Sequence, residues 1–488
     1  MKKHVPLLLA ISVSLGAHAC NSTDDRAPGS AGAMNAGGQA AGGKAAGGAS
    51  NAGAPAGGVG ATAGAAGQSS EAGDAGEASV SAAGEAGMGG AAGEGGSGGE
   101  PAGEGGASNG HTLVKALAGG QGFTCALTVA GEVRCWGNGT YGSLGDGTPV
   151  TDTKFNYSAV KVVGLTGAKK LIAAGWNACA ISSDDHLLCW GFNGQRQFAP
   201  DPQTFKGTST PISLLGFTGT AIASTIAFDG NGLTGHGCVV DAAFNIGCWG
   251  SNAADELGVT TPATSGPVLF PTGLSGYVSV AGGSQFTCGL TQGGGVKCWG
   301  ASNYGALGDG HTLDYPPPSA TPTQVVGLTT GVKQIASALS STCALTTSGG
   351  VKCWGGAGFG ELGTATPFDH QYGGLDTPTD VSGLTSGVTQ ITSGYRHFCA
   401  LLTDKTIKCW GYNQNGELGD QPNPITINLH ANLPVPVQDV SNIVAIGAGY
   451  SQTCAAPATG GVICWGSGWA SGSKTSPDRI VPTYVEGI

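Results

Sequence analysis

From about residue 111 onward, the chain consists of short apolar or β-branched runs, each bounded by a glycine-rich turn. Runs of this length and composition are typical of β-strands, and none has the period of an amphipathic helix. Four kinds of run, which we name A to D, recur in the same order. Clear examples are 277–280 for A, 124–127 for B, 296–299 for C and 322–326 for D. The pattern therefore predicts an all-β domain over residues 111–488.

The B and C runs each carry a cysteine, and the second cysteine is always followed by Trp-Gly. This hairpin occurs seven times, and its tryptophans are spaced by 50 to 59 residues. In an antiparallel pairing, cysteines ten positions apart can face each other with Cα atoms close enough for a disulfide. We therefore expect seven disulfides, and buried free thiols are the alternative. The expected pairs are Cys125 with Cys135, Cys179 with Cys189, Cys238 with Cys248, Cys288 with Cys298, Cys343 with Cys353, Cys399 with Cys409, and Cys454 with Cys464.

Seven units of four antiparallel strands suit a β-propeller, because its radial blades leave only short, protected edges. The repeats begin on an A run at 113–117 and end on a D run at 482–485. We expect the last D run to dock beside the first blade, so that the two ends share one sheet and close the ring.

The repeated unit resembles that of the regulator of chromosome condensation family. Its clearest copy runs through residues 287–290, 296–300, 304–310 and 325–328, and the resemblance covers the whole domain. It implies a seven-bladed propeller that one strand exchange closes. It does not imply the founding member's nucleotide exchange on a nuclear GTPase. An exported bacterial relative instead binds its target through aromatic side chains on the loops of one face.

The N-terminal part of the chain differs in composition. Lysines at 2 and 3 precede an apolar run at 5–15, and residues 17–19 are Ala-His-Ala. This arrangement is typical of a secretory signal peptide over residues 1–19. Residues 20–110 are almost entirely Ala, Gly, Ser and Glu, so we expect a disordered tether. Cys20 stands where an exported bacterial lipoprotein of the cell envelope or cell surface carries its lipid; a secreted product with a free Cys20 is the alternative.

Charge and motifs argue against several kinds of site. The net charge is −11 with no basic cluster, which disfavours nucleic acid and any membrane contact except through a lipid anchor. The Leu-Gly-Asp-Gly motifs at 144–147 and 307–310 lack the ligand pattern of a calcium loop, and we interpret them as turns. We expect no metal, cofactor or catalytic residue. His397 is interpreted as a hydrogen-bonding residue of an A–B turn.

In an A-B-C-D meander, the A–B turns and the C–D loops emerge on the same face. Clustered aromatic and arginine side chains there would be typical anchors of a binding interface, and the alternative is that they fold back onto the loops. The Trp of each Cys-Trp-Gly motif is interpreted instead as packing between blades. The predicted binding residues are Trp176, Tyr395, Arg396 and Tyr450 on A–B turns, and Phe155, Tyr157, Tyr315, Tyr372 and Trp469 on C–D loops.

These features favour a monomeric, exported binding or scaffold module that engages a protein or glycan partner. A carbohydrate-active lyase or hydrolase with its site in the central channel is the alternative, since distant residues can converge there. A third hypothesis is a passive structural element of the cell envelope.

Overall fold

A computed structural model describes residues 110–150, 154–194, 207–217, 219–226, 235–261, 264–311, 316–365, 373–420, 429–468, 470–472 and 478–488. The predicted signal peptide and tether, with Cys20, lie outside these residues. Three predicted binding residues, Tyr315, Tyr372 and Trp469, also lie outside them.

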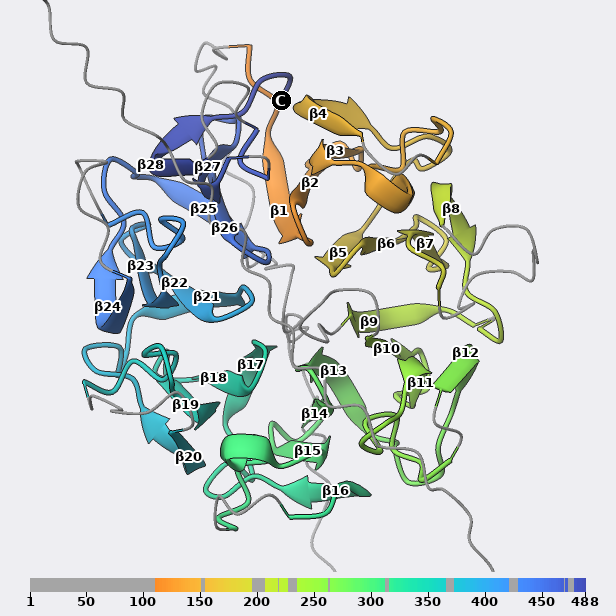
Figure 1. Ribbon diagram of the computed structural model, residues 1–488, viewed down its shortest axis with the longest axis vertical. Helices are drawn as coiled ribbons and strands as arrows, with labels where there is room; N and C mark the ends of the chain where they lie inside the picture. Colours follow the sequence, from red (N-terminus) through yellow and green to blue (C-terminus); the bar gives the residue numbers. More distant parts are fainter. Residues whose placement is uncertain are drawn as a thin grey trace, which may run out of the picture. The chain divides into compact units, whose positions relative to one another are not determined.

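The described strands form seven four-stranded antiparallel sheets, arranged as blades around one axis (Figure 1). Each blade is a continuous stretch of chain, and its strands follow one another from the axis outward. The predicted fold class is therefore confirmed. In blade order the strands are β1 (Val114–Gly119), β2 (Phe123–Thr128), β3 (Val133–Asn138) and β4 (Phe155–Lys161); β5 (Lys170–Ala174), β6 (Asn177–Ile181), β7 (Leu187–Gly191) and β8 (Thr208–Ser213); β9 (Ala221–Ile226), β10 (His236–Asp241), β11 (Ile246–Ser251) and β12 (Thr264–Leu269); β13 (Tyr277–Gly282), β14 (Phe286–Thr291), β15 (Val296–Gly300) and β16 (Ser319–Gln324); β17 (Val332–Ser337), β18 (Ser341–Thr346), β19 (Val351–Gly356) and β20 (Gly374–Asp380); β21 (Val388–Ser393), β22 (His397–Leu402), β23 (Ile407–Tyr412) and β24 (His430–Pro436); β25 (Ile443–Ala448), β26 (Gln452–Pro457), β27 (Ile463–Ser467) and β28 (Asp478–Tyr484).

The two central strands of every blade carry the predicted disulfide. In blade one, Cys125 lies opposite Cys135, as predicted, and Ala126 lies opposite Arg134. The Cα atoms of the seven bridged pairs are 4.0–4.1 Å apart, and the cysteines are buried. Each bridge closes a loop of about 11 residues, for which the chain-entropy account gives a stabilisation of about 2.5–3 kcal/mol. The bridges of blades two to seven join Cys179 to Cys189, Cys238 to Cys248, Cys288 to Cys298, Cys343 to Cys353, Cys399 to Cys409, and Cys454 to Cys464.

The Cys-Trp-Gly tryptophans join each blade to the one before it, which confirms their predicted packing role. In six junctions the indole N–H donates to a backbone carbonyl in the C–D connection of the preceding blade. The corresponding connection of blade two includes residues 195–206, which lie outside the described part of the chain. The six bonds, 2.8–3.0 Å long, are Trp136 to Ala470, Trp190 to Ser143, Trp299 to Glu256, Trp354 to Ala306, Trp410 to Glu361 and Trp465 to Glu417.

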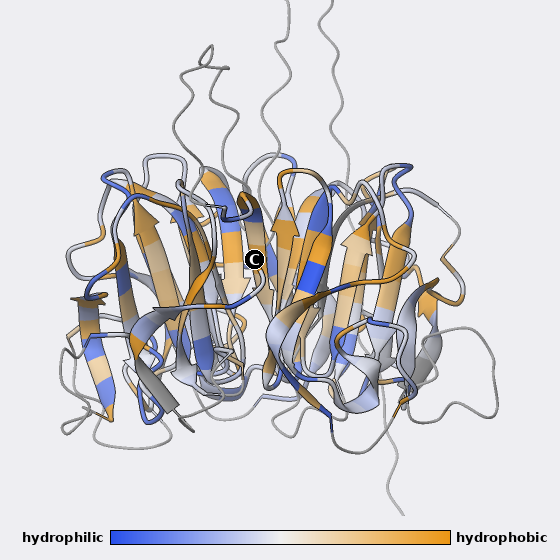
Figure 2. Cartoon of the chain, turned by 90° about the horizontal axis from the view of Figure 1, so that it is seen from above, coloured by the Kyte–Doolittle hydropathy of each residue, from blue (hydrophilic) through white to orange (hydrophobic). Residues whose placement is uncertain are grey.

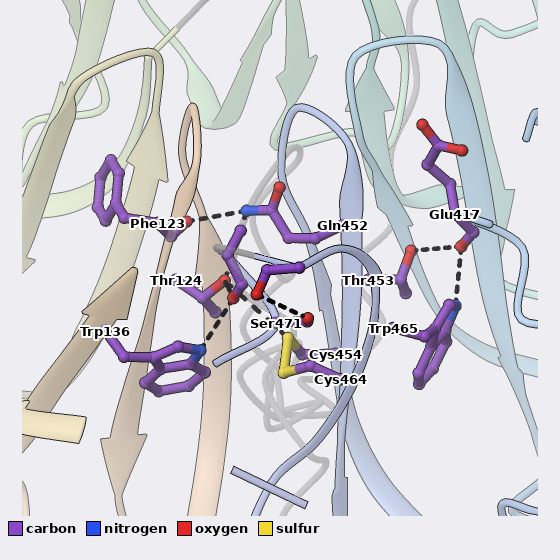
Figure 3. Close-up of a disulfide and its surroundings, with 12 residues drawn as sticks. Phe123, Thr124, Trp136, Glu417, Gln452, Thr453, Cys454, Cys464, Trp465 and Ser471 are labelled. Atoms are coloured by element: carbon purple, nitrogen blue, oxygen red, sulfur yellow. Dashed lines mark hydrogen bonds between the residues drawn. A yellow bond between two sulfur atoms is a disulfide. The ribbon is translucent and has the colours of Figure 1, made fainter. Parts of the chain in front are cut away.

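The ring closes through this same contact. Trp136 of blade one donates to the carbonyl of Ala470 in blade seven at 2.9 Å, and Val485 is buried in a cluster with Trp136. Figure 3 shows this junction beside the preceding one, where Trp465 and Thr453 both donate to Glu417. The expected strand exchange is wrong, because β1–β4 and β25–β28 are each complete sheets. The closing blades therefore need only the junction that the other blades use.

We predict that Trp136→Phe and Trp465→Phe destabilise the protein by similar amounts. Each change removes an indole N–H from a carbonyl that a threonine still contacts, Thr124 at Ala470 and Thr453 at Glu417. The lost bond and the lost volume together should cost about 1–3 kcal/mol. Thermal and urea unfolding would measure it. Destabilisation by Trp465→Phe alone would contradict the described closure.

Candidate binding face

The A–B turns of blades four, five, six, seven, one and two are joined in that order by backbone hydrogen bonds. The Leu339 N–H donates to the carbonyl of Tyr395 at 2.9 Å, and the Tyr395 N–H donates to that of Tyr450 at 3.3 Å. Since each bond crosses from one blade to the next, the turns form a linked inner rim on one face of the ring; Figure 2 shows the ring from the side, with strands running between its two faces. The same link joins Ser284 to Leu339, Tyr450 to Gly120 and Gln121 to Gly175.

The close approach of these turns explains a glycine at the end of blade six's inner strand. A Cβ atom on Gly394 would lie 2.4 Å from the carbonyl oxygen of Gly449 and 2.1 Å from the ring of His397. A side chain at this position would therefore push two blades apart.

Tyr395 and Tyr450 lie face to face on the rim. Their ring centroids are 4.1 Å apart with an angle of 15° between the planes, and both side chains are half-buried. Burial, followed by the neighbouring Tyr395, raises the pKa of Tyr450. Its hydroxyl therefore stays protonated near neutral pH, and the pair presents an ordered aromatic surface.

Arg396 continues this surface toward blade five. Its guanidinium carbon lies 4.7 Å from the ring centroid of Phe359 and 5.6 Å from that of Tyr395, which are cation–π distances. Tyr412 packs edge-on against Phe359 at 5.2 Å. We name Phe359, Tyr395, Arg396, Tyr412 and Tyr450 the aromatic–arginine cluster.

The carboxyl group beside Arg396 belongs to Glu361. An Oε1 atom of Glu361 lies 3.9 Å from Nη1 of Arg396, and Oε2 accepts the Phe359 N–H at 2.7 Å. The side chain is only 2% exposed, and burial raises the pKa of Glu361 to about 7 despite the Phe359 bond and the Arg396 charge. Near neutral pH, this carboxyl therefore carries only part of a negative charge.

A second group of aromatic residues surrounds Trp176 between blades one and two. Tyr141 contacts Trp176 at 5.5 Å and Phe192 at 4.9 Å between ring centroids, both edge-on. The Ser143 hydroxyl donates to the Trp176 carbonyl at 3.0 Å. This bond joins a C–D connection to the A–B turn of the next blade, so both kinds of connection occur on this face.

The structure does not bring all the predicted residues together. Tyr395, Arg396 and Tyr450 form one contiguous group, and Trp176 follows Gly175 on the same rim. Phe155 and Tyr157 lie instead on β4, the outermost strand of blade one, where their rings stack at 6.5 Å. They belong to the outer edge of the ring because β4 begins at Phe155, where we expected a C–D loop.

Sequence reasoning missed Tyr141, Phe192, Phe359, Glu361 and Tyr412. A signal was present, because Phe192 and Tyr412 both follow a Cys-Trp-Gly motif directly. Tyr141 and Phe359 share a second position, a few residues farther along their C–D connections. Comparing the seven repeats position by position would have marked both places.

His397 is the first residue of β22, so placing it in the turn was wrong. Its Nε2 lies 2.8 Å from the Thr453 hydroxyl of the next blade, and that hydroxyl donates to the Glu417 carbonyl at 2.9 Å. Since the Thr453 hydroxyl hydrogen points to Glu417, His397 acts as the donor to Thr453. Complete burial lowers the pKa of His397 to about 3, so the ring is neutral. The predicted hydrogen-bonding role holds, across blades rather than within a turn.

The two Leu-Gly-Asp-Gly motifs form turns as predicted. Asp146 accepts the Thr148 N–H and Asp309 accepts the His311 N–H, each at 3.2 Å. Within the described ranges, no group of three or more His, Cys, Asp or Glu side chains is placed to hold a metal ion. The same ranges contain no helix that is long and apolar enough to span a membrane.

Comparison with known sequences identifies the repeat. Profiles described as regulator of chromosome condensation (RCC1) repeat match residues 114–143, 277–306 and 388–417, and residues 294–345 and 409–456. This chain carries RCC1 repeats. The matched residues fall in blades one, four, five, six and seven of the propeller described above.

Several known proteins are similar to this chain. The ultraviolet-B receptor UVR8 of Arabidopsis thaliana is 26% identical over 393 residues, covering 77% of this chain and 82% of the receptor. The human E3 ubiquitin-protein ligase HERC2 is 28% identical over 62% of this chain, but the match spans only 6% of the ligase. Yeast RCC1 (Prp20), in its structure with Kap60, has a TM-score of 0.63 at 21% identity, covering 73% of this chain and 84% of Prp20. At that identity the likeness shows the fold.

We predict that acid destabilises the protein partly through His397. The unfolded histidine, with a pKa near 6.5, takes up a proton below that pH, whereas the folded one does not until about pH 3. The contribution to stability is complete above about pH 6.5 and is lost as the pH falls toward 3. At about pH 4.5 the loss should reach about 2–3 kcal/mol.

His397→Gln is the matched control, because Gln452 occupies the same position in blade seven and donates to the next blade at 2.9 Å. Unfolding measured between about pH 7.5 and 4.5 should show a smaller loss of stability in this variant. Equal losses in the two proteins would show that His397 is not buried as a neutral ring.

Proposed function

We propose that the protein is an exported binding module whose inner rim engages a protein partner through Trp176 and the aromatic–arginine cluster. The observation that carries this proposal is the group of Tyr395, Arg396 and Tyr450. These three half-buried side chains come from adjacent turns that backbone hydrogen bonds hold in place. Aromatic and arginine anchors that are already ordered lose little freedom on binding, which favours affinity.

The character of similar proteins supports a binding role. The structure of Prp20p from Saccharomyces cerevisiae is described together with its binding properties to Gsp1p and histones. UVR8 is a receptor. Fold likeness alone does not assign Gsp1p or histones to this chain as partners, since the loops of propellers vary more than their blades. A protein partner of this chain would be selected by its own cluster of rim residues.

The two histidines with lowered pKa values have structural roles, which does not favour catalysis by them. His236 and His397, whose pKa values burial lowers, each pair with a threonine between two blades. The inner strands end in small residues, such as 118–120 and 281–283. The enzyme hypothesis needs a cluster of perturbed acids and bases near the axis. These histidines lie between blades, and the raised pKa values of Glu361 and Tyr450 occur in or beside the aromatic–arginine cluster, which we assign to binding.

The proposal includes export and a lipid on Cys20. The N-terminal signal and the long Ala/Gly segment support it, and so do the seven disulfides, because such bridges persist outside the cytoplasm. A lipid would hold the chain at the cell envelope, with the Ala/Gly segment between the membrane and the propeller.

We predict that single changes Tyr395→Ala and Tyr450→Ala each weaken partner capture from the producing organism's envelope extract by about 30-fold or more, as expected of interface anchors. Phe155→Ala on the outer strand should leave capture unchanged. Quantitative pull-down with mass spectrometry measures all three variants, and circular dichroism verifies folding. Undiminished capture by folded Tyr395→Ala and Tyr450→Ala would refute the proposed face, and capture of a glycan alone would refute the class of partner.

We predict that Cys20 is acylated in the native organism. Metabolic labelling with an alkyne fatty acid should mark the wild-type chain, and Cys20→Ser should lose the label and leave the membrane fraction. An unlabelled wild-type chain in the culture medium would establish the secreted alternative.

A further inference from the structure

A hollow of about 210 Å³ opens on the same face between blades four and five. Arg396 and Glu361 stand at one side of it, and Gln285, Asn303 and Ser340 bring amide and hydroxyl groups to its wall. Pockets for whole small molecules usually exceed about 300 Å³, so this hollow suits one side chain or a comparably small group.

An aromatic side chain that is present at two comparable junctions is absent from this one. Between blades one and two, Phe192 packs against Tyr141; between blades five and six, Tyr412 packs against Phe359. Phe192 and Tyr412 both directly follow a Cys-Trp-Gly motif, and the residue at that position in blade five is Gly356. Tyr304, the counterpart of Tyr141 and Phe359 in blade four, lines the hollow together with Gly356.

The charge beside the hollow is positive. Arg396 is held by two aromatic rings and is 26% exposed, while its acidic neighbour Glu361 lies at 3.9 Å, beyond hydrogen-bond distance. One carboxyl oxygen of Glu361 already accepts the Phe359 N–H, and the group is partly protonated near neutral pH because burial raises its pKa to about 7. The Arg396 guanidinium therefore retains N–H donors and a net positive charge that can pair with the carboxylate of another molecule.

We propose that this hollow receives a glutamate or aspartate side chain of the partner protein, whose carboxylate pairs with Arg396. The amides of Gln285 and Asn303 and the hydroxyl of Ser340 offer further donors around it. The neighbouring Tyr395–Tyr450 pair supplies the aromatic surface on which the rest of a partner loop would lie. This inference rests on the proposed protein-binding function and names the group that the face recognises.

The test uses the mature full-length chain and N-acetyl-glutamate N-methylamide as the probe. Titration should shift the Arg396 Nε–H signal in ¹H–¹⁵N spectra and saturate with a dissociation constant on the order of 1 mM, as befits a ligand this small. The glutamine counterpart, which lacks the charge, should bind at least about tenfold more weakly. Equal binding of the two amides would overturn the proposal.

Three variants locate the site. Arg396→Gln should abolish binding, whereas Arg134→Gln, on β3, should not affect it. Gly356→Phe restores the missing aromatic residue and should abolish binding while Arg396 remains; its added Cβ requires the Ser340 hydroxyl to rotate away. Undiminished binding by a folded Gly356→Phe or Arg396→Gln would overturn the assignment.

Two further probes separate the sources of a carboxylate. N-acetyl-alanine carries a chain-terminal carboxylate, and methyl glucuronide carries that of an acidic sugar. Tighter binding of either than of the glutamate probe would overturn the choice of a protein side chain. If the probe does not bind but partner capture still depends on Tyr395 and Tyr450, the proposed role of the hollow is wrong and the binding face stands. If the probe binds but the rim variants do not affect partner capture, the proposed protein-binding function is wrong.

Discussion

The bond from the tryptophan indole to the preceding blade's carbonyl, present at six junctions of the described residues, is the interaction on which the ring depends. It requires the glycine that follows the tryptophan. That glycine adopts a positive φ in every blade, and in blade four a Cβ there would lie 2.5 Å from the Gln285 carbonyl. Trp-Gly is thus one structural unit: the glycine lets the adjacent strands approach, and the tryptophan spans the gap between blades. Because the donor lies in one blade and the acceptor in the one before it, the same contact can be repeated from one blade to the next.

Much of this architecture could be predicted from the sequence because it depends on local spacing. The ten-position spacing of the cysteines determines which residues of the hairpin face each other, so that Cys179 meets Cys189 and Cys343 meets Cys353 as expected. The count of Trp-Gly motifs determines the number of blades. The closure could not be predicted in this way. Both a shared sheet and two complete sheets satisfy the order of strands, and the choice depends on whether residues 478–484 pair with β27 or with the first blade. They pair with β27.

The candidate site was predicted only in part, for a related physical reason. Turn residues such as Tyr395 and Tyr450 were recognisable because their place in the repeat puts them on the rim. Glu361 and Phe359 act through contacts with another blade, and their partners are about 35 to 50 residues away in the chain. A similar difference separates His397 from Gln452: both join two blades at the same repeat position, but only one of them can be protonated in mild acid. The backbone arrangement is similar from one junction to the next, whereas the side chains differ between junctions.

The seven disulfides all lie inside single hairpins and none crosses between blades. During oxidative folding, each hairpin can form its disulfide once its own stretch of about 11 residues is available. The correct partner is also the nearest cysteine along the chain. Such neighbours pair faster than distant ones because little loop entropy is lost. The fourteen cysteines can consequently be oxidised in order from the N-terminus without a reshuffling step, and the finished ring contains no covalent lock at its seam.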